Sequence, residues 1–124
     1  MRAVLAAALL CFVACVMLPA AARGHHRAIA HVGVGGDPRP AAWCGWQMRQ
    51  WYHVADRAYN VARKWAAYGV ATVARVGAIV VWPHHVGRIV GQSGGQWVIE
   101  SGNDGHAIRT RPRSIAGVIA IRWP

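Results

Sequence analysis

The sequence predicts an α+β domain in which N-terminal helices pack on a small antiparallel sheet of about four or five strands. Apolar residues recur at helical spacing between residues 43 and 68. After residue 69 the pattern changes to short apolar runs separated by turns that contain glycine or proline. Short turns of this kind join antiparallel neighbours, so the helices come first and the sheet follows.

The first 22 residues are set apart from this domain. Arg2 precedes an apolar run over residues 3–18, and Pro19 and three alanines follow it. This order is typical of a secretory signal peptide cleaved after Ala22, because the run is shorter than the roughly 20 residues that span a bilayer. The alternatives are a retained membrane anchor and, in third place, a lipoprotein acylated at Cys15. We therefore expect a periplasmic or secreted protein, with membrane contact only through an uncleaved signal segment.

Residues 23–42 predict a flexible lead-in, since five glycines and prolines lie between positions 33 and 40 and no apolar period is visible. Cleavage after Ala22 would leave Arg23, Gly24 and His25 at the amino terminus. An amine, two amides and an imidazole in that order can surround Cu(II) or Ni(II), which makes His25 a speculative metal ligand. The other histidines are dispersed and the chain has only four acidic residues, so we expect no zinc or calcium site and no cofactor.

The domain itself spans residues 43–124. It is small, and its seven tryptophans would enlarge the buried area. Over residues 43–53, Cys44, Met48 and Trp51 share one face of a predicted helix. A second helix is predicted over residues 55–68, ended by Gly69. Its apolar stripe consists of Ala58, Val61, Ala62 and Trp65.

The strands follow in order. Residues 76–83 form a continuous apolar run closed by Pro83, which is typical of a buried strand. Residues 85–91 and 96–101 flank the sequence QSGG and predict a hairpin. Residues 107–112 and 117–124 are two further candidate strands.

The formal net charge is +10, and loss of Arg2 with the signal peptide leaves 13 basic and 4 acidic residues, or +9. The basic residues are scattered, and no zinc-finger, RNP or recognition-helix pattern is present, so we expect no nucleic-acid partner. Net positive charge alone attracts a protein to anionic envelope polymers. The alternative explanation of the positive charge is that it keeps the protein soluble. The same explanation applies to Arg109, Arg111 and Arg113, which are predicted to form a solvated edge.

Cys44 is the candidate for chemistry. Cys11 and Cys15 leave with the signal peptide, so Cys44 would stand alone in an oxidising compartment. That predicts either intermolecular pairing, a working thiol, or an inert buried thiol. A helix N-terminus lowers the pKa of a thiol, and Gly45 would let a substrate approach the backbone. His85 opens a strand and is a candidate base.

The partner strand of the hairpin supplies a third polar group. Pairing about the hairpin loop sets His85 opposite roughly Gly102, with Glu100 and Asn103 both within reach. An amide oxygen would fix the imidazole tautomer, and a carboxylate would also raise its pKa.

The motifs of residues 43–124 are the cysteine at the start of the first helix, HVGRIVG at the start of a strand, the glycine-containing hairpin, SGN after the next strand, and RPRS and IRWP near the end. In the order of these motifs, residues 43–124 resemble the NlpC/CHAP superfamily. These are papain-like cysteine amidases and peptidases that act on bacterial cell walls, and the likeness is to a small exported branch. The resemblance implies Cys44 as nucleophile, His85 as base and Asn103, with Glu100 second, as the orienting group. It also implies a helix–sheet junction across which Cys44 and His85 face each other.

The resemblance implies an exported amidase or endopeptidase that cuts amide bonds in peptidoglycan peptides, and we expect a monomer. Trp43 and Trp46 beside the nucleophile are candidate walls for glycan stacking, with core packing as the alternative. His84 is predicted to be a turn residue, with the role of base as the alternative, and it is also a weaker candidate for contact with substrate. Two other functions stay open: a non-catalytic envelope binding or scaffold protein on the same fold, and a basic envelope or nucleic-acid-binding protein in which Cys44 is structural.

Overall fold

The computed structural model describes residues 32–124. The signal peptide over residues 1–22 and the metal site at His25 therefore lie outside the described residues. The elements begin with one α-helix and two 3-10 helices: α1 (Cys44–Tyr52), η1 (Arg57–Asn60) and η2 (Ala62–Ala67). Six strands follow: β1 (Val70–Ala71), β2 (Ile79–Val81), β3 (Val86–Ser93), β4 (Gln96–Asp104), β5 (Ala107–Arg113) and β6 (Ala120–Trp123).

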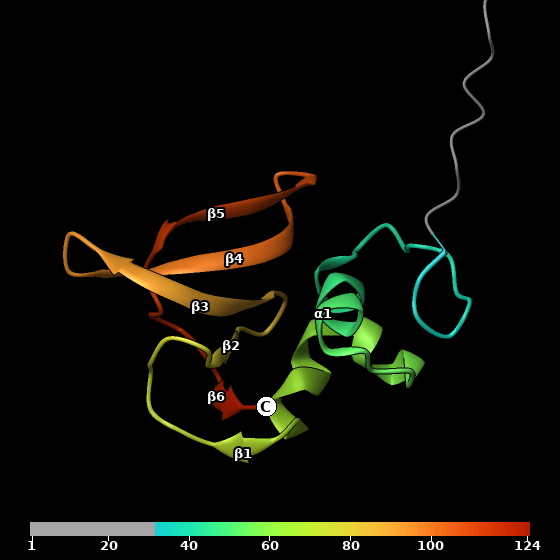
Figure 1. Ribbon diagram of the computed structural model, residues 1–124, viewed down its shortest axis with the longest axis horizontal. Helices are drawn as coiled ribbons and strands as arrows, with labels where there is room; N and C mark the ends of the chain where they lie inside the picture. Colours follow the sequence, from blue (N-terminus) through green and yellow to red (C-terminus); the bar gives the residue numbers. More distant parts are fainter. Residues whose placement is uncertain (1–31) are drawn as a thin grey trace, which may run out of the picture.

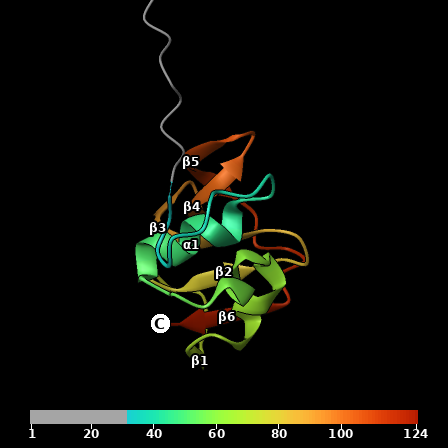
Figure 2. The same cartoon turned by 90° about the vertical axis from the view of Figure 1, so that its right-hand side faces the viewer.

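The six strands form one antiparallel sheet in the order β1-β6-β2-β3-β4-β5. The helical elements lie together on one side of it (Figures 1 and 2). The α+β class and the antiparallel pairing are as the sequence predicts, and the strand count exceeds the four or five expected. The extra strand is β1, whose two exposed residues pair with β6 through Val70↔Trp123 and Ala71↔Arg122. Two residues carry no alternation that a sequence pattern can reveal.

The predicted second helix over residues 55–68 is wrong, because the chain forms two short 3-10 helices there. Val61 separates them in an extended conformation, with φ −79° and ψ 119°, and its side chain is 63% exposed. Only Ala62 and Trp65 of the predicted stripe are buried. These two are three residues apart, which is the repeat that aligns side chains in a 3-10 helix.

Two apolar clusters lie on opposite faces of the sheet. The first joins α1 to the sheet through Cys44, Met48, Trp65, Ile79, Val81 and Val86. The second lies on the other face and contains Ala78, Val80, Trp82, Ile89 and Ile99. Strand β2 contributes to both clusters, which explains why its sequence is continuously apolar rather than alternating.

Residues 32–42 are packed against α1, which corrects the predicted lead-in that ends at residue 42. Asp37 is only 3% exposed, and its Oδ2 lies 2.6 Å from Nη1 of the fully buried Arg49. Arg49 also donates to Asn60 Oδ1 and to the carbonyls of Val34, Val54 and Ala55. The hydrogen bond from Arg49 is the main cause that holds the pKa of Asp37 below its ordinary value. A buried carboxylate requires such a partner, and α1 provides it.

In the described part of the chain, no helix is long and apolar enough to cross a membrane.

Candidate active site

Cys44 is the first residue of α1, and its thiol is free and 5% exposed. Burial raises the pKa of the thiol, and the backbone N–H groups of Gly45, Val86 and Cys44 itself offset this rise only in part. The pKa of the Cys44 thiol is therefore raised, and the lowered pKa expected from its place at a helix N-terminus is wrong. Removal of the sulfur from water disfavours its anion more than the nearby amides favour it.

Gly45 has a structural role that the sequence did not reveal. A Cβ atom at this position would collide with the carbonyl oxygens of Tyr59 and Asn60. The absence of a side chain therefore lets η1 pack directly against the start of α1. This packing also brings Asn60 close to the start of α1.

Cys44 opens on a pocket of about 380 Å³. The other lining residues are Pro40, Ala42, Asn60, Val61, Ala62, Pro83 and His84. The loop before α1, the break between the 3-10 helices and the β2–β3 turn thus meet around the sulfur. The imidazole that lines this pocket is that of His84, the residue taken from the sequence as a turn residue or substrate contact.

The ring of His85 is directed to the opposite face of the sheet. Its Nε2 lies 3.0 Å from Ser101 Oγ, and its ring centre lies 5.9 Å from that of Trp82, which belongs to the second apolar cluster. Within residues 32–124, no hydrogen bond joins the Cys44 sulfur to an imidazole. The backbone of His85 is nevertheless close to the thiol, because the N–H group of the next residue, Val86, faces the sulfur.

Burial lowers the pKa of His85 from 6.5 to about 4, and the positive charge of Arg113 acts in the same direction. The imidazole is therefore neutral at pH 7 and can accept a proton from a neighbouring group. Its environment disfavours the imidazolium, so a permanent thiolate–imidazolium pair is not stabilised here.

The shifted pKa of His85 predicts a pH-dependent stability. The unfolded chain binds a proton at His85 near pH 6.5, and the folded chain does so only near pH 4. Stability is thus fully present above pH 6.5 and falls as the pH drops toward 4. Urea unfolding across this range should show a smaller decline in His85→Gln. The control His106→Asn, at an exposed position, should keep the decline of the wild type. Equal slopes in all three proteins would contradict the assignment.

Neither the Asn103 nor the Glu100 side chain forms a hydrogen bond with His85. Asn103 has φ 53°, and its Nδ2 donates to the carbonyl of Ala41 at 3.4 Å, just before α1. Glu100 forms an ion pair with Arg88, 2.6 Å from its Nη2, and the Arg88 guanidinium lies 4.3 Å from the ring centre of Trp51. Glu100 therefore faces α1, the side of the sheet away from the His85 ring.

Ser101 is the site residue that the sequence analysis missed. It is 1% exposed, and its hydroxyl is the polar group in contact with His85. When the register of the pair Arg88↔Glu100 is extended toward the start of β3, Gly87 lies opposite Ser101 and His85 lies opposite Asn103. The predicted residue opposite His85 was Gly102, which is one position away. Since alternate residues share a face, Ser101 lies on the same side as His85. The register predicted from the sequence is off by one position and puts Glu100 on that face instead, so the sequence held no signal for Ser101.

Trp43 and Trp46 are 6% and 5% exposed, which agrees with the core-packing alternative. The Arg39 guanidinium covers Trp43, 4.6 Å from its ring centre. Both tryptophans also line a hollow of about 500 Å³ beside β5, on the far side of α1's first turn from the thiol pocket.

In residues 32–124, no three histidine, cysteine, aspartate or glutamate side chains gather in a way that could hold a metal ion. Comparison with known family models, characterised proteins and solved structures finds no match to this chain.

Proposed function

We propose that the protein is a cysteine hydrolase that cleaves amide bonds, with Cys44 as nucleophile. The observation that carries this proposal is the placement of the free Cys44 thiol at the first position of α1. It sits at a pocket, with the backbone N–H groups of Gly45 and Val86, besides its own, facing its sulfur and with two histidines on the adjoining turn. N–H groups so placed can stabilise the oxyanion that forms when the sulfur attacks a carbonyl.

The pKa shifts favour one form of this mechanism. A thiol with a raised pKa and an imidazole with a lowered pKa are both neutral at pH 7. The imidazole would take the thiol proton as the sulfur attacks the carbonyl, and would then pass it to the leaving amine. Water would release the acyl group from the sulfur and restore the thiol.

The proposal keeps His85 as the base and requires its ring to turn from Ser101 toward the sulfur. Because the Cα–Cβ bond of His85 points to the face away from Cys44, this requires the β2–β3 turn to move as well as the side chain. We expect His85→Ala to lose about 10³-fold in kcat and His84→Ala less than tenfold. The measurement is steady-state hydrolysis of a peptide amide, with circular dichroism to confirm folding. If His84→Ala loses more activity than His85→Ala, the base is His84, which lines the pocket in this structure.

The proposed substrates are peptidoglycan peptides, which is what the resemblance to NlpC/CHAP enzymes implies, and the proposed site of action is the periplasm or the exterior. The test is incubation of the protein without residues 1–22 with purified peptidoglycan, followed by mass spectrometry of the released fragments. New amine and carboxylate termini in the fragments would support the proposal. Intact peptides after prolonged incubation would contradict this substrate class.

A second candidate function is a non-catalytic envelope binding protein on the same fold. The contact between His85 and Ser101, on the face away from Cys44, favours it. The rate of alkylation by iodoacetamide separates the two functions. A hydrolase with a base at hand should react near neutral pH, with a rate that falls in His85→Ala. A merely buried thiol should react only as the pH approaches its raised pKa, and identically in that variant.

A further inference from the structure

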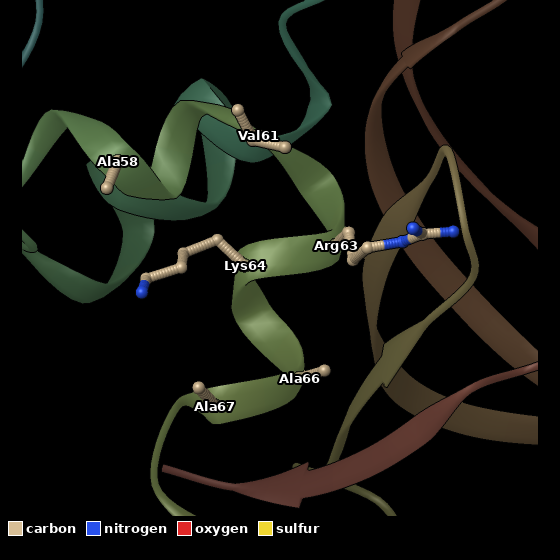
Figure 3. Close-up of a pocket in the computed structure, with 6 residues that line it drawn as sticks. All are labelled: Ala58, Val61, Arg63, Lys64, Ala66 and Ala67. Atoms are coloured by element: carbon tan, nitrogen blue, oxygen red, sulfur yellow. The ribbon is translucent and has the colours of Figure 1, made fainter.

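A shallow groove runs along η1 and η2 next to the thiol pocket (Figure 3). Its volume is about 630 Å³, and its lining consists of Ala58, Val61, Arg63, Lys64, Ala66 and Ala67. Four of these six residues are small and apolar, and the Val61 side chain is 63% exposed. The surface accordingly offers an apolar floor on which a peptide can lie.

The groove and the thiol pocket meet at Val61, which lines both of them. The extended conformation of Val61 between the two 3-10 helices places it at this junction. A peptide whose carbonyl lies at the Cys44 sulfur can therefore continue over Val61 into the groove. The break in the predicted second helix is what creates this path.

Two positive charges flank the groove. The side chains of Lys64 and Arg63 extend in opposite directions, so the charges stand at opposite margins (Figure 3). Neither is neutralised by an acidic side chain, because the chain has only four and each is engaged elsewhere. Asp37 pairs with Arg49, Glu100 with Arg88 and Asp104 with Arg111, and Asp56 accepts the N–H group of Ala58.

We infer that this groove is a substrate subsite for a carboxylate-bearing peptide, whose negative charge is recognised by Lys64 and Arg63. The inference rests on the proposed function, since it assigns the groove to the substrate that Cys44 attacks. Ion pairs at a partly exposed surface contribute modestly to affinity, and two of them predict a preference of about fivefold for an anionic over a neutral peptide.

The test uses ¹⁵N-labelled Cys44→Ala protein, in which binding is measured without turnover. It is titrated with succinyl-Ala-Ala-Ala-amide and with the neutral acetyl-Ala-Ala-Ala-amide. We expect amide shifts at Val61, Ala66 and Ala67, and about fivefold tighter binding of the succinyl peptide. The added substitutions Arg63→Gln and Lys64→Gln should abolish this preference. Arg57→Gln with Arg109→Gln, which removes two charges outside the groove, should retain it.

Three results would overturn the proposed subsite: equal affinity for the two peptides, no detectable amide shifts, or a loss of the charge preference in the control pair as large as in the groove variant. The hydrolase proposal fails separately. A preserved charge preference in Cys44→Ala, together with a wild-type protein that cleaves nothing, would leave the groove as a binding site and reject the enzyme. Cleavage without any charge preference would reject the subsite alone.

Discussion

Arg49→Met is expected to unfold most of the domain. The guanidinium of Arg49 is fully buried and donates to two side chains and three backbone carbonyls from different segments. Methionine can fill part of the volume, but it leaves the carboxylate of Asp37 buried without its partner. Removal of one member of a buried ion pair costs about 3–5 kcal/mol, which is a large share of the stability of so small a domain.

Urea denaturation followed by tryptophan fluorescence measures this effect. The matched control is Arg57→Met, because Arg57 is exposed and makes one long hydrogen bond, 3.4 Å to the carbonyl of Gly35. It should change the unfolding free energy by less than about 0.5 kcal/mol. The double variant Asp37→Asn with Arg49→Met should recover part of the loss, since no buried charge then remains unpaired. If Arg49→Met unfolds at the midpoint of Arg57→Met, the pair does not hold residues 32–42 in place.

Cys44→Ala is expected to lower hydrolysis by about 10⁴-fold or more, because no other group in the pocket can form the acyl intermediate. The fold should survive. The substitution removes one sulfur atom from a cluster that retains Met48 and Trp65, at a cost of about 1 kcal/mol. The measurement is kcat/KM for a peptide amide, with the unfolding midpoint recorded on the same preparation.

Cys44→Ser is the informative companion, since serine keeps a hydroxyl at the same position but is a poor nucleophile without a strong base. It should be nearly as inactive as Cys44→Ala if the sulfur attacks the substrate. Full activity in either variant, in protein shown to be folded, would remove Cys44 from the mechanism and favour the binding-protein function.

Most of the sheet could be predicted from the sequence because its signals are local. The apolar run around β2, the hairpin with positive φ at Gly94 and Gly95, and the start of α1 at Cys44 each depend on residues close together in the chain. Position along the chain was sufficient for these predictions.

The partner of the His85 side chain could not be predicted from local signals. Glu100 and Asn103 were both within reach by residue count, yet Glu100 lies on the α1 face with Arg88 and Asn103 turns toward Ala41. A pairing register that differs by one position changes which side chains share a face. Ser101 then becomes the contact, a residue with no distinguishing signal of its own.

The sequence by itself determined the class of the fold, the succession of helices and strands along the chain and the place of Cys44 at a helix start, because period and turn chemistry are properties of the chain. The tertiary structure alone decided three other features: that Arg49 draws residues 32–42 into the domain, that the second helix breaks at Val61, and that the His85 ring faces Ser101. Each depends on a contact between segments far apart in the chain. The free energy of such a contact overrides the local preference of either segment.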